Sequence, residues 1–140
     1  MIPASLVLVS CNFPLVTEMY LFFRQGCVVR FEDLDVWKRS ARLSSDIYKH
    51  FRTCKDFGFK DQITRSSLSI PSNIAEGYER FSNKETKQFL YYAKGSCGEL
   101  RTQLYIAMDI ELIAKDSALY WINETVEISK MLYGLIQKTK

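Results

Sequence analysis

The chain has 140 residues, of which 47% are hydrophobic and 14% aromatic, so it is long enough for one packed domain and too short for two. Its formal net charge of +3 is small for a dedicated nucleic-acid-binding protein, so any such role has to come from local clustering of charge. The four cysteines include no close pair, which excludes a zinc ligand set and a CxxC redox motif and fits reduced thiols in a cytoplasm.

Residues 1–30 differ in composition from the rest of the chain. The first 23 residues are apolar, but Pro3, Pro14 and Glu18 interrupt them, and no Lys or Arg precedes them as a secretory signal requires. A membrane span is therefore not expected. We expect residues 1–30 to be an N-terminal extension, either disordered or translated from a misassigned start codon, with a short strand or an amphipathic contact as the alternative. Residues 31–140 then form the folded domain.

Two helices are predicted in the first half of this domain from residues that recur in alternating three- and four-residue steps. The first helix starts near Asp33, whose carboxylate suits an N-cap. Its inner face comprises Leu34, Trp37, Ala41, Ser44, Tyr48 and Phe51. The inner face of the second helix comprises Phe59, Ile63, Ser67, Ile70, Ile74 and Tyr78. We expect Gly77 to end the second helix as a left-handed C-cap.

Pro71 lies inside the second predicted helix. A proline removes one backbone donor and clashes with the preceding turn, which costs about 3 kcal/mol in a helix interior. We expect a kinked but continuous helix, because no glycine or turn pair that would start a loop occurs there. The hydroxyls of the surrounding serines, including Ser66 and Ser67, are expected to bond the carbonyl groups that the kink frees.

A third helix is predicted to begin at Ser82-Asn-Lys-Glu85, which has the S-x-x-E form of a capping box. Its inner face comprises Phe89, Ala93, Ser96, Leu100, Leu104 and Ala107. Gly95 and Gly98 cost about 1 kcal/mol each relative to alanine in a helix interior. We therefore expect the small side chains around them to let another helix approach closely.

A fourth helix is predicted after a cap at Asp116 or Ser117. Its first apolar stripe comprises Leu119, Ile122, Val126, Ser129, Tyr133 and Ile136, and its second comprises Trp121, Ile128, Met131, Leu132 and Leu135. Two stripes exceed what packing inside a small bundle requires, which suggests a subunit interface. The whole pattern predicts an all-α fold, an antiparallel up-down-up-down four-helix bundle with a kinked second helix.

Residue types that carry catalysis are scarce in this chain. A di-iron site needs Glu-x-x-His pairs, and the single histidine, His50, has Ile47 at that spacing. Asn73 and Glu76 lie one turn apart and suit either a metal or acid–base role, or a structural role between helices. We favour the structural role, because no second acid stands at a catalytic spacing. The sequence therefore predicts no enzyme activity, no cofactor and no metal site.

The first predicted helical hairpin is strongly basic. Residues 38–65 carry eight lysines and arginines against three aspartates, a net charge of +5. Phe57 and Phe59 lie among these charges, and nucleic-acid surfaces often mix aromatic and basic side chains in this way. We predict that the hairpin binds RNA. The predicted phosphate contacts are Arg39, Arg42, Lys60 and Arg65. A protein-interaction scaffold without nucleic-acid binding is the alternative.

Three stretches also resemble a known family. They are Phe31-Glu-Asp-Leu-Asp-Val-Trp37, the run from Ser66 to Gly77 that contains the signature residues Pro71, Asn73, Glu76 and Gly77, and the run from Gly95 to Leu104. Over about residues 31–140 the chain resembles bacterial four-helix-bundle proteins encoded within intervening sequences of 23S rRNA genes. The resemblance implies a homo-oligomer, a ring-shaped pentamer. A related group acts as the accessory protein of diversity-generating retroelements, which adds RNA or a reverse transcriptase as implied partners.

Overall fold

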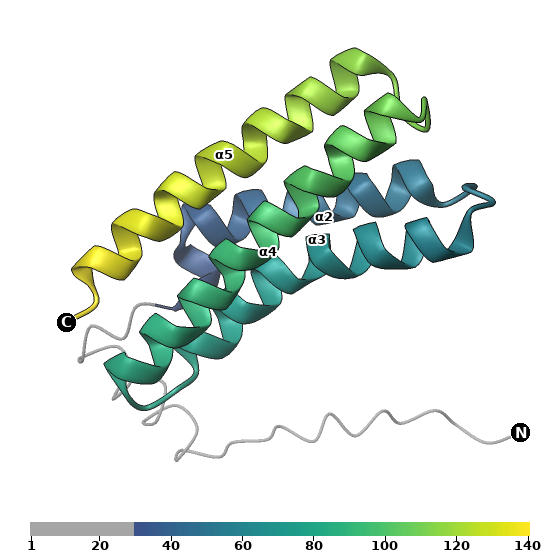
Figure 1. Cartoon of the computed structure of the whole chain (residues 1–140). Helices are drawn as coiled ribbons and strands as arrows, with labels where there is room; N and C mark the ends of the chain where they lie inside the picture. The colour runs from purple at the N-terminus through teal and green to yellow at the C-terminus, as the bar shows by residue number, and fades with distance from the viewer. Residues whose placement is uncertain (1–29) are drawn as a thin grey trace, which may run out of the picture.

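The computed structural model of the protein describes residues 30–140, so the prediction for residues 1–30 lies outside the described residues except at Arg30. A 3-10 turn and four α-helices follow one another: η1 (Phe31–Asp33), α2 (Asp35–Phe51), α3 (Phe57–Tyr78), α4 (Asn83–Asp109) and α5 (Lys115–Lys138). No strand occurs between residues 30 and 140. The prediction of an all-α fold with four helices is confirmed, and Figure 1 shows the helices packed as one bundle.

Consecutive helices make the main contacts of the bundle. α3 packs most extensively against α4, followed by α4 against α5 and α2 against α3, whereas α2 and α5 share a smaller contact. Contacts between neighbouring helices run in reverse order along the chain: Phe51 with Phe59 and Ser44 with Ser67, then Ser66 with Gln103 and Ser69 with Ser96. Pairing in reverse sequence order is the pattern that oppositely directed neighbours produce.

α2 turns a different face to the core from the one predicted. Its buried residues are Val36, Ser40, Leu43, Ser44, Ile47 and Phe51. Trp37 and Ala41 are half-buried and Tyr48 is 44% exposed, so three members of the predicted inner face lie at its edge or outside it. Ser40 is accommodated inside because its hydroxyl donates to the carbonyl oxygen of Trp37 at 2.9 Å. The predicted cap is also wrong, because Leu34 precedes α2 without a side-chain cap bond.

α3 runs unbroken through Pro71, as expected, and a bend at that residue stays a prediction. The carbonyl that Pro71 leaves without its helical N–H partner belongs to Ser67, four residues earlier. The hydroxyls of Ser66 and Ser67 instead donate to the carbonyl oxygens of Ile63 and Thr64, at 3.1 and 2.8 Å. The predicted role of these two serines at the freed carbonyl is therefore wrong. Their buried hydroxyls are instead hydrogen-bonded to carbonyl oxygens of the preceding turn of α3.

Gly77 lies within α3 and has no positive φ, so the predicted left-handed C-cap is wrong. The residue is needed for close packing. A Cβ built on Gly77 would lie 2.8 Å from Cβ of Phe89 and 3.2 Å from the carbonyl oxygen of Thr86, both on α4. Only a residue without a side chain allows α3 and α4 to approach this closely.

Gly95 and Gly98 do not have the role predicted for them. A Cβ added at either position would meet no atom within 4 Å, so these glycines do not mediate a close approach within residues 30–140. The cap at the start of α4 is as predicted, because the hydroxyl of Ser82 accepts from the amide of Glu85 at 3.2 Å. α4 ends at Asp109, and Glu111 two residues later has a φ of 59°, the left-handed conformation that often follows a helix end.

α5 begins earlier than predicted, and its buried face draws on both of the apolar stripes predicted for it. Its first residue is Lys115, without a side-chain cap bond. Ile128 and Leu132 lie in the core, whereas Leu119 and Tyr133 of the other stripe are 39% and 56% exposed. Ile122 and Ile136 of that first stripe are nevertheless buried, so the core takes residues from both stripes and the surplus apolar residues of α5 are exposed.

Candidate nucleic-acid interface

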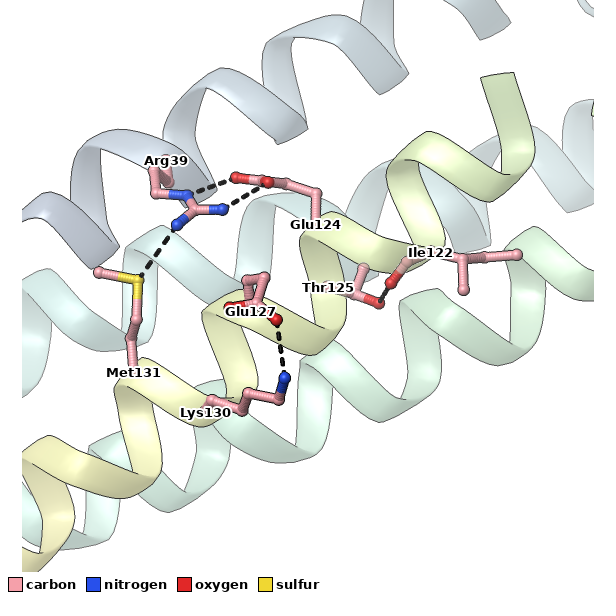
Figure 2. Close-up of polar contacts among 7 residues, drawn as sticks. All are labelled: Arg39, Ile122, Glu124, Thr125, Glu127, Lys130 and Met131. Carbon is pink, nitrogen blue, oxygen red and sulfur yellow. Dashed lines mark hydrogen bonds and ion pairs between the residues drawn. The ribbon is translucent and has the colours of Figure 1, made fainter. Parts of the chain in front are cut away.

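Arg39, the first of the predicted phosphate contacts, is partly exposed and already paired with a carboxylate. Its Nε and Nη2 atoms donate to the two carboxylate oxygens of Glu124 on α5, at 2.7 and 2.6 Å, as Figure 2 shows. Its Nη1 atom lies 3.7 Å from Sδ of Met131. The Glu124 hydrogen bonds raise the pKa of the Arg39 guanidinium. A bidentate pair of this kind fixes geometry, so Arg39 ties α2 to α5.

The other three predicted contacts present their charges more openly. Arg42 is exposed and has no ion-pair partner among residues 30–140. Nζ of Lys60 donates to the carbonyl oxygen of Arg52 at 2.9 Å, which leaves its charge without a carboxylate in the described part of the chain. Arg65 lies 3.6 Å from Asp61, but both side chains are well exposed, so this ion pair is weak.

These three residues are spread along the hairpin. Lys60 lies beside the C-terminal end of α2, because its Nζ atom reaches Arg52, the residue that caps that helix. Arg42 lies nine residues before the end of α2, which is roughly 13 Å along a helix. The hairpin therefore offers a row of charges along its length and a denser group at its turn.

The turn between α2 and α3 carries several cations and an exposed aromatic ring. Arg52 and Lys55 are exposed, no carboxylate in the described residues lies within ion-pair distance of them, and Lys60 is next to Arg52. Phe57 is 76% exposed. Asp56 shapes the turn, because its carboxylate accepts the amide of the third residue after it at 3.0 Å. Arg52 and Lys55 belong to the predicted basic hairpin but were not among its four predicted phosphate contacts. Their position between two helical patterns was the signal that could have identified them.

Asn73 and Glu76, two of the signature residues of α3, have different structural roles. The side-chain amide of Asn73 donates to the carbonyl oxygen and to the hydroxyl of Ser69, at 2.8 and 2.9 Å. That hydroxyl lies 2.9 Å from the hydroxyl of Ser96 on α4. Glu76 is exposed and pairs with Arg80 one turn later. Asn73 therefore joins a polar link between α3 and α4, as the structural role predicts, and Glu76 does not.

His50 and the buried Cys97 are side chains of the types that metal and thiol chemistry use. No group of three or more His, Cys, Asp or Glu side chains in this range could hold a metal ion. His50 is exposed, and its Nε2 atom lies 3.4 Å from the carbonyl oxygen of Leu112. Cys97 is fully buried, and burial raises the pKa of its thiol to about 12. The reactive thiolate is therefore almost absent at neutral pH.

The raised pKa of Cys97 leads to a testable expectation for thiol modification. In a variant with Cys11, Cys27 and Cys54 changed to serine, an aromatic disulfide reagent should modify the native protein negligibly between pH 7 and 9. The folded-state pKa lies above this window, so the thiol stays protonated and covered. Modification should become rapid once urea unfolds the chain. A native-state rate that is rapid and levels off with pH inside this window would contradict the assignment, because the thiol would then titrate within or below the window.

The described residues therefore form an all-helical bundle with an exposed cationic turn between α2 and α3. The family model described as 23S rRNA-intervening sequence protein matches residues 32–134, and the chain belongs to this family. None of the helices between residues 30 and 140 combines the length and apolar content needed to cross a membrane.

The chain is also similar to a solved structure. This is a protein of unknown function from the S23 ribosomal protein family of Bacteroides thetaiotaomicron, with 28% sequence identity and a TM-score of 0.68. The match covers 72% of this chain and 97% of the other. No curated protein matches the chain.

Proposed function

We propose that this protein is a non-enzymatic, homo-oligomeric bundle that binds structured RNA or a ribonucleoprotein through the α2–α3 hairpin. The observation that carries the proposal is the α2–α3 turn. Arg52, Lys55 and Lys60 have no carboxylate partner among residues 30–140, and Phe57 of the same turn is exposed. Phosphates are bound by such cations, and unstacked bases stack on such rings. Arg42 and Arg65 extend the cationic surface along the hairpin. Arg39 has a structural role, because its ion pair with Glu124 joins α2 to α5.

The family description makes RNA the first ligand to test, because it names 23S rRNA. Oligomerisation would strengthen a weak surface of this kind. Each copy repeats the same cationic turn, and linked sites gain affinity from effective concentration without any new contact. The modest net charge of one chain is then compatible with RNA binding.

Apolar side chains on the outer faces of α4 and α5 support the homo-oligomer. Exposed members are Tyr91, Tyr92, Tyr105 and Ile106 on α4, Ile110 just after it, and Leu119, Tyr120 and Tyr133 on α5. Exposed large apolar residues in this number are enriched at protein–protein interfaces. A ring of five copies is the assembly that the family resemblance implies. The same surface favours the second candidate, a protein-interaction scaffold that binds no nucleic acid.

A charge-reversal variant separates the two candidates. The triple variant Arg42→Glu, Lys60→Glu, Arg65→Glu should bind structured RNA more weakly, and its plot of log affinity against log salt should be flatter by about two. The effect arises because each phosphate contact that is lost no longer releases counterions. The measurement is fluorescence anisotropy with labelled RNA at several salt concentrations.

The matched control is Lys130→Glu, Lys138→Glu, Lys140→Glu, which changes the net charge by the same amount in and after the C-terminal half of α5, away from the α2–α3 turn. It should leave the salt slope nearly unchanged. Equal losses of slope in both variants would show that net charge alone governs binding and would remove the hairpin assignment. No RNA binding by the unchanged protein at low salt would favour the scaffold.

A further inference from the structure

η1, α2 and α3 enclose an apolar groove on the surface of the bundle. It has a volume of about 620 Å³, and none of the residues that line it is charged. The main lining residues are Phe31, Trp37, Ala41, Tyr48, Leu68 and Pro71. The first four come from η1 and α2, and three of them belong to the stripe that the sequence pattern assigned to the core. α2 therefore carries two apolar stripes, and only one of them is buried in the bundle.

The groove is a formed surface with exposed apolar walls. The rings of Phe31 and Trp37 meet edge to face, with centroids 5.2 Å apart, which fixes the wall where the chain enters the bundle. Tyr48 and Leu68 are 44% and 48% exposed. Covering such surface is favourable by about 25 cal/mol per Å². A groove without charge along its length suits an apolar segment better than a polar ligand.

The chain itself supplies a segment of that chemistry at the right place. Residues 1–29 are followed by Arg30 and then by Phe31, whose side chain lines the groove. Residues 1–23 contain a single charged side chain, Glu18. Apolar sequence of this kind is costly to leave in water.

The preceding chain is also long enough to reach along the groove. The groove follows α2 from Trp37 to Tyr48, which is about 16 Å of helix. Extended backbone covers that distance with about five residues. We propose that the segment before Arg30, residues 1–29, docks in the groove and covers it. This docking would give the extension a role in the fold and leave the outer faces of α4 and α5 for the oligomer.

Photo-crosslinking of the full chain tests the proposal. Ser45 lines the groove and is exposed, so it is replaced by p-benzoylphenylalanine, and the same residue is placed at the exposed Asn123 on α5 as the control. After irradiation, mass spectrometry identifies the attached peptides. The expected result is a cross-link from position 45 to residues 1–29 and none of that kind from position 123. Cross-links from position 45 only to residues 30–140 of a second copy, or no cross-link, would overturn the proposal.

A pair of leucine variants tests whether apolar contact drives the docking. Leu68→Glu puts a carboxylate into the groove, whereas Leu119→Glu makes the same change at a half-exposed position of α5. Circular dichroism should show unchanged helix content in both, because neither leucine lies in the core. Leu68→Glu should lower the yield of the cross-link to residues 1–29 about tenfold, and Leu119→Glu should leave it unchanged. Equal yields in both variants would contradict docking by apolar contact.

Discussion

Replacing Ile47 by alanine should lower the free energy of unfolding by about 3 kcal/mol, the usual cost of deleting a fully buried aliphatic side chain. Ile47 is 0% exposed in the core, although the sequence pattern placed its neighbour Tyr48 there. Tyr48→Ala should cost about 1 kcal/mol or less, because 44% of this residue is already exposed. Urea unfolding followed by circular dichroism measures both values. A larger loss for Tyr48→Ala would contradict the orientation of α2.

Replacing Gly77 by alanine should also destabilise the protein, by about 2 kcal/mol. The new Cβ would lie 2.8 Å from Cβ of Phe89 and 3.2 Å from the carbonyl oxygen of Thr86. Neither atom can swing away, since the backbone of α4 fixes both, so the two helices would have to separate. This cost exceeds the gain of about 1 kcal/mol that alanine offers over glycine in a helix.

Gly98→Ala is the matched control for Gly77→Ala. Gly98 lies in the interior of α4, and an added Cβ would meet no atom within 4 Å. The substitution should therefore stabilise the protein by up to about 1 kcal/mol. Opposite signs for the two variants in the same urea experiment would support the packing described here. Destabilisation by Gly98→Ala would instead reveal a neighbour at this face, such as a second copy of the chain.

The presence of the four helices could be predicted because each carries a strong helical period, and Ser82 marks the start of α4 by a cap that the structure contains. The orientation of α2 could not be predicted by the same means. Its two apolar stripes are nearly equal, and a serine such as Ser40 counts against a core position unless its hydroxyl finds a local carbonyl. The periodicity of apolar residues identifies the buried face of a helix only when one stripe is clearly more apolar than the other.

The predicted sites show a similar division. A count of charges identified the basic hairpin, but it could not show which of its cations form ion pairs within the fold. Arg39 is taken by Glu124, which lies 85 residues later in the chain. Gly77 was expected at a helix end, because sequence alone does not reveal that α4 passes beside it. The pairing of Arg39 and the role of Gly77 both depend on contacts between residues far apart in the sequence. A local sequence pattern does not indicate such contacts.

The most direct test of the proposed function is the salt dependence of RNA binding by the full chain, recorded together with the mass of the complex. We expect an oligomer that binds structured RNA at low salt and loses affinity steeply, with a slope of log affinity against log salt of about −3 or steeper. That result would establish several phosphate contacts per binding event. Absence of binding at low salt, or affinity that does not change with salt, would contradict an RNA-binding role for the hairpin.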